Sequence, residues 1–278
     1  MKKINRRSFL AAAGLTAAAL ALTACGGSAS STASSTASSA ASSEAASTSA
    51  AAELTTVEAG KLTMATNATF PPYEMTTDSG EIEGIDVDTA KAIAEKLGLE
   101  LQIDDMDFDA ALLSVQQGKA DIVMAGVTVT DERKAVMDFS DSYATGIQSI
   151  IVPEGSDITS PDDLAGKKIG TQRGTTGYIY CSDDFGDDAV VAYDDGLTAV
   201  QALKNGQVDA VVIDNAPAQE FVAANPGLVI LDTSYAEEDY AIGLAKGSAL
   251  EDAVNAALEE LKADGTLQSI VDKYITAE

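Results

Sequence analysis

The sequence predicts an α/β protein whose folded part forms two lobes. From residue 61 onward, short apolar segments typical of strands alternate with segments whose apolar residues recur at helical spacing. The alternation stops at residues 138–148, which we read as a strand that leaves one lobe for another, and then resumes. Residues 117–126 (QGKADIVMAG) and 205–214 (NGQVDAVVID) also share the order helix end, glycine, two residues, aspartate and apolar strand. Because short echoes arise by chance in α/β proteins, this one supports two similar lobes only weakly.

The first α/β series begins with a strand at 61–66 (KLTMAT) that runs into NATFPPYEM. Prolines cannot donate a ladder hydrogen bond, so the strand is expected to stop there and to leave Phe70 and Tyr73 on a loop. Open α/β sheets bind ligands at the carboxyl ends of their strands, where this loop lies. Apolar spacing and glycine stops predict the remaining elements: a helix at 86–97, a strand ending near 103, a helix from Phe108 to 117 and a strand at 121–124.

The second series is predicted by the same signals. It comprises a strand at 168–171, a glycine- and threonine-rich loop at 173–177, a strand at 190–193, a helix at 197–205, a strand at 209–213, a helix after Pro217, a strand at 240–245 and two amphipathic helices at 250–262 and 267–274.

The first 24 residues predict an export signal rather than part of the fold. Basic residues precede a 16-residue apolar run, which is short for a membrane span, and no acid occurs in it. The run ends in LTAC before Gly26, which resembles the lipobox of bacterial lipoproteins, and this resemblance implies a lipid anchor on Cys25. The segment NRRSFL resembles a twin-arginine export motif with departures, so ordinary Sec export remains an alternative.

Residues 26–52 consist almost wholly of Ser, Ala, Thr and Gly, with Glu44 as the only charge. Such a tract cannot bury enough apolar surface to offset its ordering entropy, so we expect a flexible tether. As a coil it would span roughly 30 Å root-mean-square.

Charge and cysteine content exclude several classes of function. The net charge of −27 disfavours nucleic acid and anionic lipid as partners. With Cys25 lipidated, Cys181 has no partner for an intrachain disulfide and reads as a half-buried small residue. The chain has no histidine and no metal-ligand spacing, so we expect neither a metal nor another cofactor. The aspartate pairs at 183–184 and 187–188 lack the calcium-loop pattern and read as a solvated loop.

The segment AGVTVTDER at 125–133 predicts an anion receptor. Gly126 allows a sharp turn or a close approach after the preceding strand. Thr130 is a candidate N-cap of the next helix, and Arg133 follows about one turn later, so backbone amides, hydroxyls and a guanidinium converge. The alternative is an ordinary strand–helix turn whose arginine pairs with Glu132 or another surface acid.

Asp214, at the equivalent place in the echo, would supply the opposite charge. An α-amino acid could then place its carboxylate on Arg133 and its ammonium on Asp214, so that each buried charge is paired. Its side chain would lie between Phe70 and Phe108. The alternative for Asp214 is an N-cap of the helix that contains Pro217.

The segments NATFPPYE, GIDVDTAKAIAEKLG, MDFDAALL, GKADIVMAGVTVTDERKAVMDFSDSY, GTQRGTTG, DAVVIDN and DGTLQSIVDKY, in this order, resemble the solute-binding proteins of polar amino-acid ABC importers, bacterial extracellular solute-binding protein family 3. The resemblance covers residues 60–276. It implies a two-lobed periplasmic-binding-protein type II fold with two hinge strands, lobe 1 at 58–143 plus 239–278 and lobe 2 at 144–238, after a tether at 25–57.

The resemblance also implies roles for individual residues. Arg133 would clamp the ligand carboxylate, helped by Thr128 and by Thr175 and Thr176 of the other lobe. Asp214 would bind the ammonium, assisted by the Gly126 carbonyl and the Thr128 hydroxyl. The full set of ligand-binding residues expected is Asn67, Phe70, Phe108, Ala125, Gly126, Thr128, Arg133, Gln172, Thr175, Thr176 and Asp214.

Two of these positions bear on specificity. Many relatives carry an acid where Asn67 stands, and some carry lysine where Gln172 stands. Since Asn67 offers no charge to a basic side chain, the sequence favours a neutral, polar or modestly apolar amino acid. The alternative is that Glu74 or another acid supplies that charge.

The function implied is capture, closure and delivery to an ABC transporter permease, without enzymatic chemistry. We expect a monomer anchored at the cell surface, on the extracytoplasmic face of the membrane. The alternatives are a surface lipoprotein that senses amino acids and, less favoured, a dehydratase-type enzyme on the same fold.

Overall fold

The computed structural model describes residues 54–275, all within one compact unit. The predicted export signal, Cys25 and the tether up to residue 53 lie outside the described residues. None of the helices in the described range is long and apolar enough to cross a membrane.

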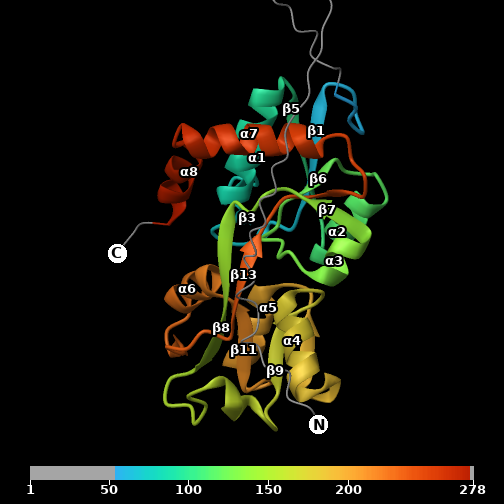
Figure 1. Ribbon diagram of the computed structural model, residues 1–278. Helices are drawn as coiled ribbons and strands as arrows, with labels where there is room; N and C mark the ends of the chain where they lie inside the picture. The colour runs from blue at the N-terminus through green and yellow to red at the C-terminus, as the bar shows by residue number, and fades with distance from the viewer. Residues whose placement is uncertain (1–53, 276–278) are drawn as a thin grey trace, which may run out of the picture. The chain divides into compact units, whose positions relative to one another are not determined.

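The first lobe is built on a five-stranded sheet of order β5-β1-β6-β14-β7. Its strands are β1 (Lys61–Thr66), β5 (Glu100–Asp105), β6 (Ile122–Val123), β7 (Met137–Phe139) and β14 (Gly243–Ala245), and its helices are α1 (Ile85–Leu97), α2 (Phe108–Gln116), α3 (Asp131–Val136), α7 (Glu251–Ala263) and α8 (Thr266–Tyr274). The helices α7 and α8 pack beside α1, as Figure 1 shows, although they follow it by more than 150 residues. The two ends of the described chain therefore complete the same lobe.

The second lobe is built on a sheet of order β10-β9-β11-β8-β12, to which β13 adds by pairing with β8. Its strands are β8 (Ala144–Pro153), β9 (Ile169–Gln172), β10 (Val190–Tyr193), β11 (Ala210–Asp214), β12 (Leu228–Ile230) and β13 (Ala236–Tyr240), and its helices are α4 (Thr176–Phe185), α5 (Gly196–Lys204) and α6 (Asn215–Ala224), with short 3-10 turns η1 (Pro161–Leu164) and η2 (Asp187–Ala189).

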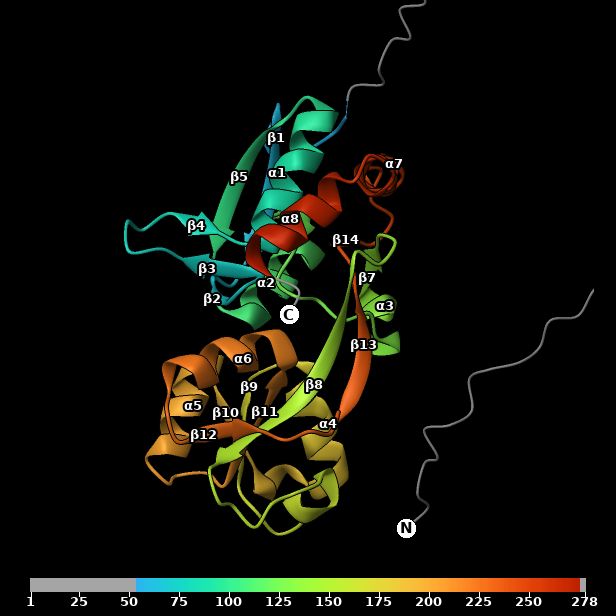
Figure 2. The ribbon, with the colours of Figure 1, turned by 90° about the vertical axis from the view of Figure 1, so that its left-hand side faces the viewer.

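Two strands connect the lobes. The strands β8 and β13 run antiparallel, with register from Ala236 opposite Gln148 to Tyr240 opposite Ala144. Figure 2 shows this pair passing between the two lobes. The hydrogen bonds between the two strands restrict their backbone torsions. Changes in backbone angle near the ends of the strands can therefore rotate one lobe relative to the other.

The sequence echo corresponds to a repeated backbone arrangement. In the first lobe Asp121 accepts a hydrogen bond from the Thr63 N–H at 2.8 Å, and its own N–H donates to the Thr63 carbonyl at 2.9 Å. In the second lobe Asp209 makes the same two contacts with Lys168, at 2.7 and 2.8 Å. In each case the aspartate ties a strand to its parallel neighbour. The following strands, β6 and β11, each begin directly after the aspartate and so start at corresponding places.

Several sequence predictions need correction. The loop predicted at 173–177 leads directly into α4, which we did not expect, and the 183–184 aspartates lie in that helix rather than in a loop. The 187–188 pair lies in η2. The segment 138–148 contains the end of β7 and the start of β8, separated by a turn, because β7 pairs with β14 of the first lobe before the chain leaves it.

The strands of the 67–83 and 228–245 regions also differ from prediction. Phe70 lies on β2 (Thr69–Phe70), which pairs with β3 (Glu74–Thr76), itself paired with β4 (Ile82–Glu83), so the prolines form a turn within a small sheet instead of a free loop. The predicted strand at 240–245 is two strands, β13 and β14, because the chain changes partners from β8 to β6 and β7 between them. The short β12 was not predicted.

Candidate ligand-binding site

A cavity of about 310 Å³, including the part open to solvent, lies between residues of the two lobes. Its lining contains all eleven residues predicted as ligand-binding, together with Glu74: Asn67, Phe70, Glu74, Phe108, Ala125, Gly126, Thr128, Arg133, Gln172, Thr175, Thr176 and Asp214. The fold therefore brings the predicted set to one place.

Arg133 is fixed by local structure at its backbone and by carbonyls at its side chain. The Thr130 hydroxyl accepts from the Arg133 N–H at 3.1 Å, which confirms the predicted N-cap of α3. The guanidinium donates from Nη1 to the Thr128 carbonyl at 2.8 Å and from Nη2 to the Gly174 carbonyl of the second lobe at 3.1 Å. It also lies over the Phe108 ring, 5.4 Å from the centroid.

Arg133 is a buried cation, with 8% of its surface exposed. Burial lowers the pKa of Arg133 below its usual value, and the charges of Glu238 and Asp214 are among those that oppose the shift. Within the described residues Arg133 forms no ion pair with Glu132, which is exposed, so the surface-pair alternative does not describe this side chain. A buried guanidinium with spare donors is suited to an anion.

Gly174 and Thr175 shape the start of α4. Gly174 has φ of +73°, and a Cβ there would collide with the Asp109 carboxylate across the cleft, so glycine permits the close approach of the lobes. The Thr175 hydroxyl donates to the Gln172 carbonyl at 2.8 Å and accepts from the Tyr178 N–H at 3.3 Å, which caps the helix. The first N–H groups of α4, at Thr176 and Gly177, have no partner within the helix and suit an anion.

Asp214 holds the N-cap position of α6, yet its carboxylate does not cap that helix. Its Oδ2 accepts from the Gln148 Nε2 at 2.8 Å, and its Oδ1 accepts from the Tyr240 hydroxyl. Burial, followed by the charge of Glu238, raises the pKa of Asp214 to about 8, against the lowering effect of Gln148 and Arg133. The alternative of a capping carboxylate is therefore wrong, since Asp214 has the N-cap position but its side chain lines the cavity. Binding of an ammonium by Asp214 stays a prediction.

Two further acids lie at this site: Glu74 lines the cavity, and Asp86 contacts Gly126 of the lining. Asp86 accepts from the Gly126 N–H at 3.0 Å and from the Tyr143 hydroxyl at 2.7 Å, and burial raises its pKa to about 6. Burial and the charge of Asp86 raise the pKa of Glu74 well above its usual value. Neither Glu74 oxygen accepts a hydrogen bond from the described residues. Glu74 is therefore a buried carboxyl whose hydrogen-bonding capacity the described residues leave unused.

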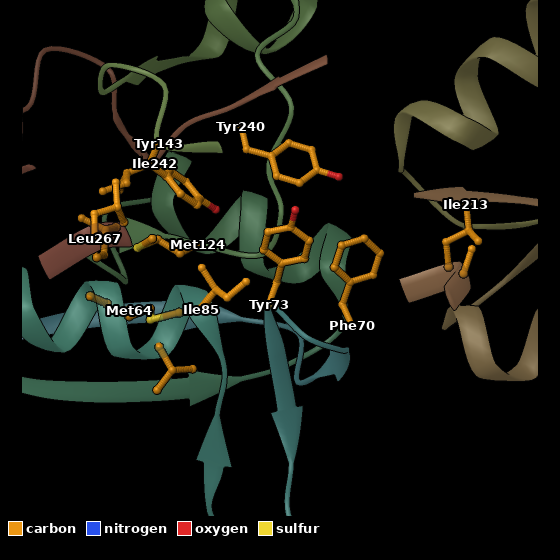
Figure 3. Packing of buried hydrophobic residues seen from close by; sticks show 14 of the residues in the cluster. Met64, Phe70, Tyr73, Ile85, Met124, Tyr143, Ile213, Tyr240, Ile242 and Leu267 are labelled. Atoms are coloured by element: carbon orange, nitrogen blue, oxygen red, sulfur yellow. The ribbon is translucent and has the colours of Figure 1, made fainter. Parts of the chain in front are cut away.

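Gly126 makes the close packing at this point possible. Its φ is +54°, and a Cβ would lie 2.8 Å from the ring of Phe70. Figure 3 shows the rings of Phe70, Tyr73 and Tyr240 gathered together. Phe70 and Tyr73 stack with centroids 5.8 Å apart, and Tyr73 meets Tyr240 edge-on at 5.3 Å. Phe70 therefore rests on a rigid aromatic group, whereas Phe108 packs against Arg133.

The lobes touch directly across the cavity. Besides the Arg133–Gly174 contact, Gln172 Nε2 donates to the Asn67 Oδ1 at 2.9 Å, and Asn67 Nδ2 donates to the Met106 carbonyl at 3.0 Å. Asn67 and Gln172 thus pair with each other from opposite lobes. The structure is a closed form.

Gln148 and Glu238 were not predicted to act at the site, and Glu74 was considered only as an acid that could supply the charge absent at Asn67. Gln148 and Glu238 lie on the two connecting strands and contact residues of the cavity wall. An acid beside a predicted binding loop was a signal for Glu74. No local pattern marks Glu238, which lies in a run of acids. Among the described residues, no group of His, Cys, Asp and Glu could hold a metal ion. Cys181 is fully buried in α4.

Comparisons with known proteins agree with this architecture. The chain is 33% identical to a probable histidine-binding protein of Neisseria gonorrhoeae, over 99% of this chain and 98% of that protein. Two solved structures of an ancestral arginine-binding protein superpose on 78% of this chain: one bound to arginine (44% identity, TM-score 0.74, 98% of that chain) and one bound to glutamine (43% identity, TM-score 0.75, 99% of that chain). These neighbours confirm the expected two-lobed fold with two hinge strands.

A family model covers nearly the whole described range. The match runs from residue 62 to residue 277 and so includes both lobes, both hinge strands and every residue of the cavity lining. The chain belongs to the bacterial extracellular solute-binding proteins, family 3.

Proposed function

We propose that this chain captures a free α-amino acid between its lobes and delivers it to the permease of an ABC importer. One observation carries the proposal: a buried guanidinium of the first lobe and a buried carboxyl of the second lobe line the same small cavity. A zwitterion is the ligand that pairs both groups at once, and burial makes an unpaired charge costly.

The carboxylate end of the ligand would bind at Arg133 and the start of α4. A guanidinium has five N–H donors, and Arg133 uses two of its groups on the carbonyls of Thr128 and Gly174. The remaining donors, with the free N–H groups of Thr176 and Gly177, come from both lobes. A carboxylate held there would favour the closed form, because those donors meet only when the lobes are together.

The ammonium end would bind at Asp214. An ammonium beside this carboxylate would restore its ionised form, since the pKa of about 8 reflects burial without a cation in contact. The Gly126 carbonyl and the Thr128 hydroxyl, which the family resemblance implicates, belong to the same cavity.

The ligand side chain would extend along Phe70 towards Asn67, Gln172 and Glu74. The uncharged Asn67 led us to expect a neutral or polar side chain, but relatives named for histidine and arginine binding do not support that preference. The buried Glu74, which accepts no hydrogen bond from the described residues, favours one that donates. The relatives are named for binding histidine, arginine, glutamine and cystine, so their named ligands are both basic and uncharged amino acids. We therefore propose an amino acid whose side chain donates hydrogen bonds, such as arginine, histidine or glutamine.

Anchoring and delivery complete the proposal. Lipidation at Cys25 would tether the lobes through residues 25–57 to the outer face of the membrane, with lobe boundaries at 143/144 and 238/239. A long tether leaves the orientation free, so that the closed form can meet a permease in the same membrane. The ligand is released unchanged when the lobes separate.

The test is a thermal-shift screen of the purified full chain in detergent against the common amino acids and small carboxylates lacking an amino group, followed by calorimetry on each hit. We expect stabilisation by one or a few amino acids, since a ligand that binds the folded state raises its melting temperature. Stabilisation by carboxylates alone, with no amino acid bound, would overturn the proposal.

A further inference from the structure

Glu238 lies at the junction of the two lobes and is not part of the cavity wall. It belongs to the connecting strand β13, where burial alternates: Glu237 and Asp239 are exposed, whereas Glu238 is only 7% exposed. Its carboxylate points to the same face of the strand as the ring of Tyr240. An acid buried at a hinge must have partners that offset its desolvation.

Those partners come from both lobes and from the hinge. A single oxygen, Oε2, accepts from the Thr128 hydroxyl at 3.1 Å, from the Thr176 hydroxyl at 2.9 Å and from the Gln148 Nε2 at 3.1 Å. Thr128 precedes α3 in the first lobe, and Thr176 opens α4 in the second. Both threonines line the cavity, so Glu238 reaches the binding site through them.

The consequence follows from the hydrogen inventory of a hydroxyl. A threonine hydroxyl has one hydrogen to donate and lone pairs that accept. When both hydroxyls donate to Glu238, neither has a hydrogen left for a ligand carboxylate, and only their acceptor side can serve the cavity. Thr128 has no other hydrogen bond to its hydroxyl, and Thr176 also accepts weakly from Gln148 at 3.4 Å.

We infer that Glu238 is a positioning residue that orients these two hydroxyls as acceptors and thereby selects ligands with an α-ammonium group. Together with Asp214, the hydroxyls form a set of acceptors that matches the three donors of an ammonium; an α-hydroxyl has one hydrogen to donate to them, and an α-keto oxygen has none. The carboxylate of the ligand is left to Arg133 and to backbone N–H groups. This inference rests on the proposed function and adds the residue that determines whether the two hydroxyls accept or donate hydrogen bonds towards the ligand.

The test compares each amino acid with its deaminated analogue in the Glu238→Gln variant. The probes are L-arginine against 5-guanidinopentanoate and L-glutamine against glutaramate, measured by calorimetry on the full chain. An amide can donate to the threonine oxygens, so the hydroxyls are freed to turn. We expect the affinity ratio of amino acid to analogue to fall by about tenfold or more, as for loss of hydrogen bonds to a charged group.

Glu237→Gln is the matched control, because it removes the same charge from the next position on the same strand but from an exposed side chain. This control should keep the wild-type ratio. An unchanged ratio in Glu238→Gln, with amino-acid binding intact in the wild type, overturns the role of Glu238 and leaves the proposed function standing. A wild type that binds neither amino acid nor analogue refutes the proposed function, and this inference with it.

A second pair of variants keeps the inference testable if Glu238→Gln does not fold. Thr176→Ser retains the hydroxyl and should keep the ratio, whereas Thr176→Val removes the oxygen that faces the ammonium and should lower it. Equal ratios in the serine and valine variants would also overturn the inference. A purely structural role for Thr176 would change the melting temperature and both affinities together, not their ratio.

Discussion

The charge state of Asp214 makes amino-acid binding depend on pH in a defined direction. In the closed form without a ligand the pKa of this carboxyl is about 8, because it is buried and lies near Glu238. At pH 7 about one molecule in eleven then has Asp214 ionised. An ammonium ligand binds the ionised form, so the pKa of Asp214 falls in the complex and a proton leaves on binding. The affinity should therefore rise with pH, by about tenfold per unit up to pH 8.

Calorimetry with L-arginine measures both consequences. No group of free arginine titrates between pH 6 and 8, so the ligand does not contribute to the slope. Titrations at pH 7 in buffers of different ionisation enthalpy should show release of close to one proton per arginine bound. The Asp214→Asn variant should bind more weakly and release none, which separates Asp214 from Asp86 behind the site. Wild-type affinity that stays constant from pH 6 to 8, or binding without proton release, would refute the reasoning.

Three further predictions concern single positions. Arg133→Ala should weaken amino-acid binding by about 3 kcal/mol or more, since it leaves a desolvated carboxylate unpaired, and unchanged affinity in calorimetry would contradict its role. The raised pKa of Asp86, about 6 against 3.8, means that the native state holds its proton more tightly than the unfolded state; its contribution to stability is complete below pH 4 and is lost as the pH rises through 6. Urea unfolding should therefore show that the wild type loses roughly 3 kcal/mol of unfolding free energy between pH 4 and pH 6, and that Asp86→Asn loses less. If both proteins lost the same free energy over this pH range, burial of Asp86 could not be the cause. In Gly146→Ala a Cβ would lie 2.4 Å from the fully buried Tyr240 ring. Scanning calorimetry should therefore show destabilisation by about 1–3 kcal/mol. An unchanged melting temperature would mean that the Tyr240 ring can move aside without cost.

The parts of the fold that the sequence predicted well are those whose signals are local. The cap at Thr130 depends on a hydroxyl that accepts a hydrogen bond from the N–H three residues later. Helix α1 depends on apolar residues at helical spacing before Gly98. The candidate site was predictable because its residues follow strand ends, which place side chains at one edge of a sheet. The internal echo suggested that Arg133 and Asp214, which lie 81 positions apart, bind the two charges of one ligand, and the family resemblance implied the same roles.

The parts that were missed depend on distant contacts. Helix α4 contains Gly177, isoleucine and two tyrosines, which are weak helix formers; it is held by the Thr175 cap and by packing on β9 and β11. Strand β13 reads AEEDY, without an apolar alternation, and exists because it pairs with β8. The burial of Glu238 follows from that pairing, so its role could not be read from the acidic run around it.

The position of β14 has a consequence for how the protein is made. This strand is inserted between β6 and β7, and it is synthesised after every strand of the second lobe. A chain that emerges amino terminus first leaves the edges of β6 and β7 uncovered until residue 245 has followed. The lobe that starts first is thus the one that finishes last, and the loss of a short carboxyl-terminal stretch would leave it incomplete while the other lobe keeps all its strands.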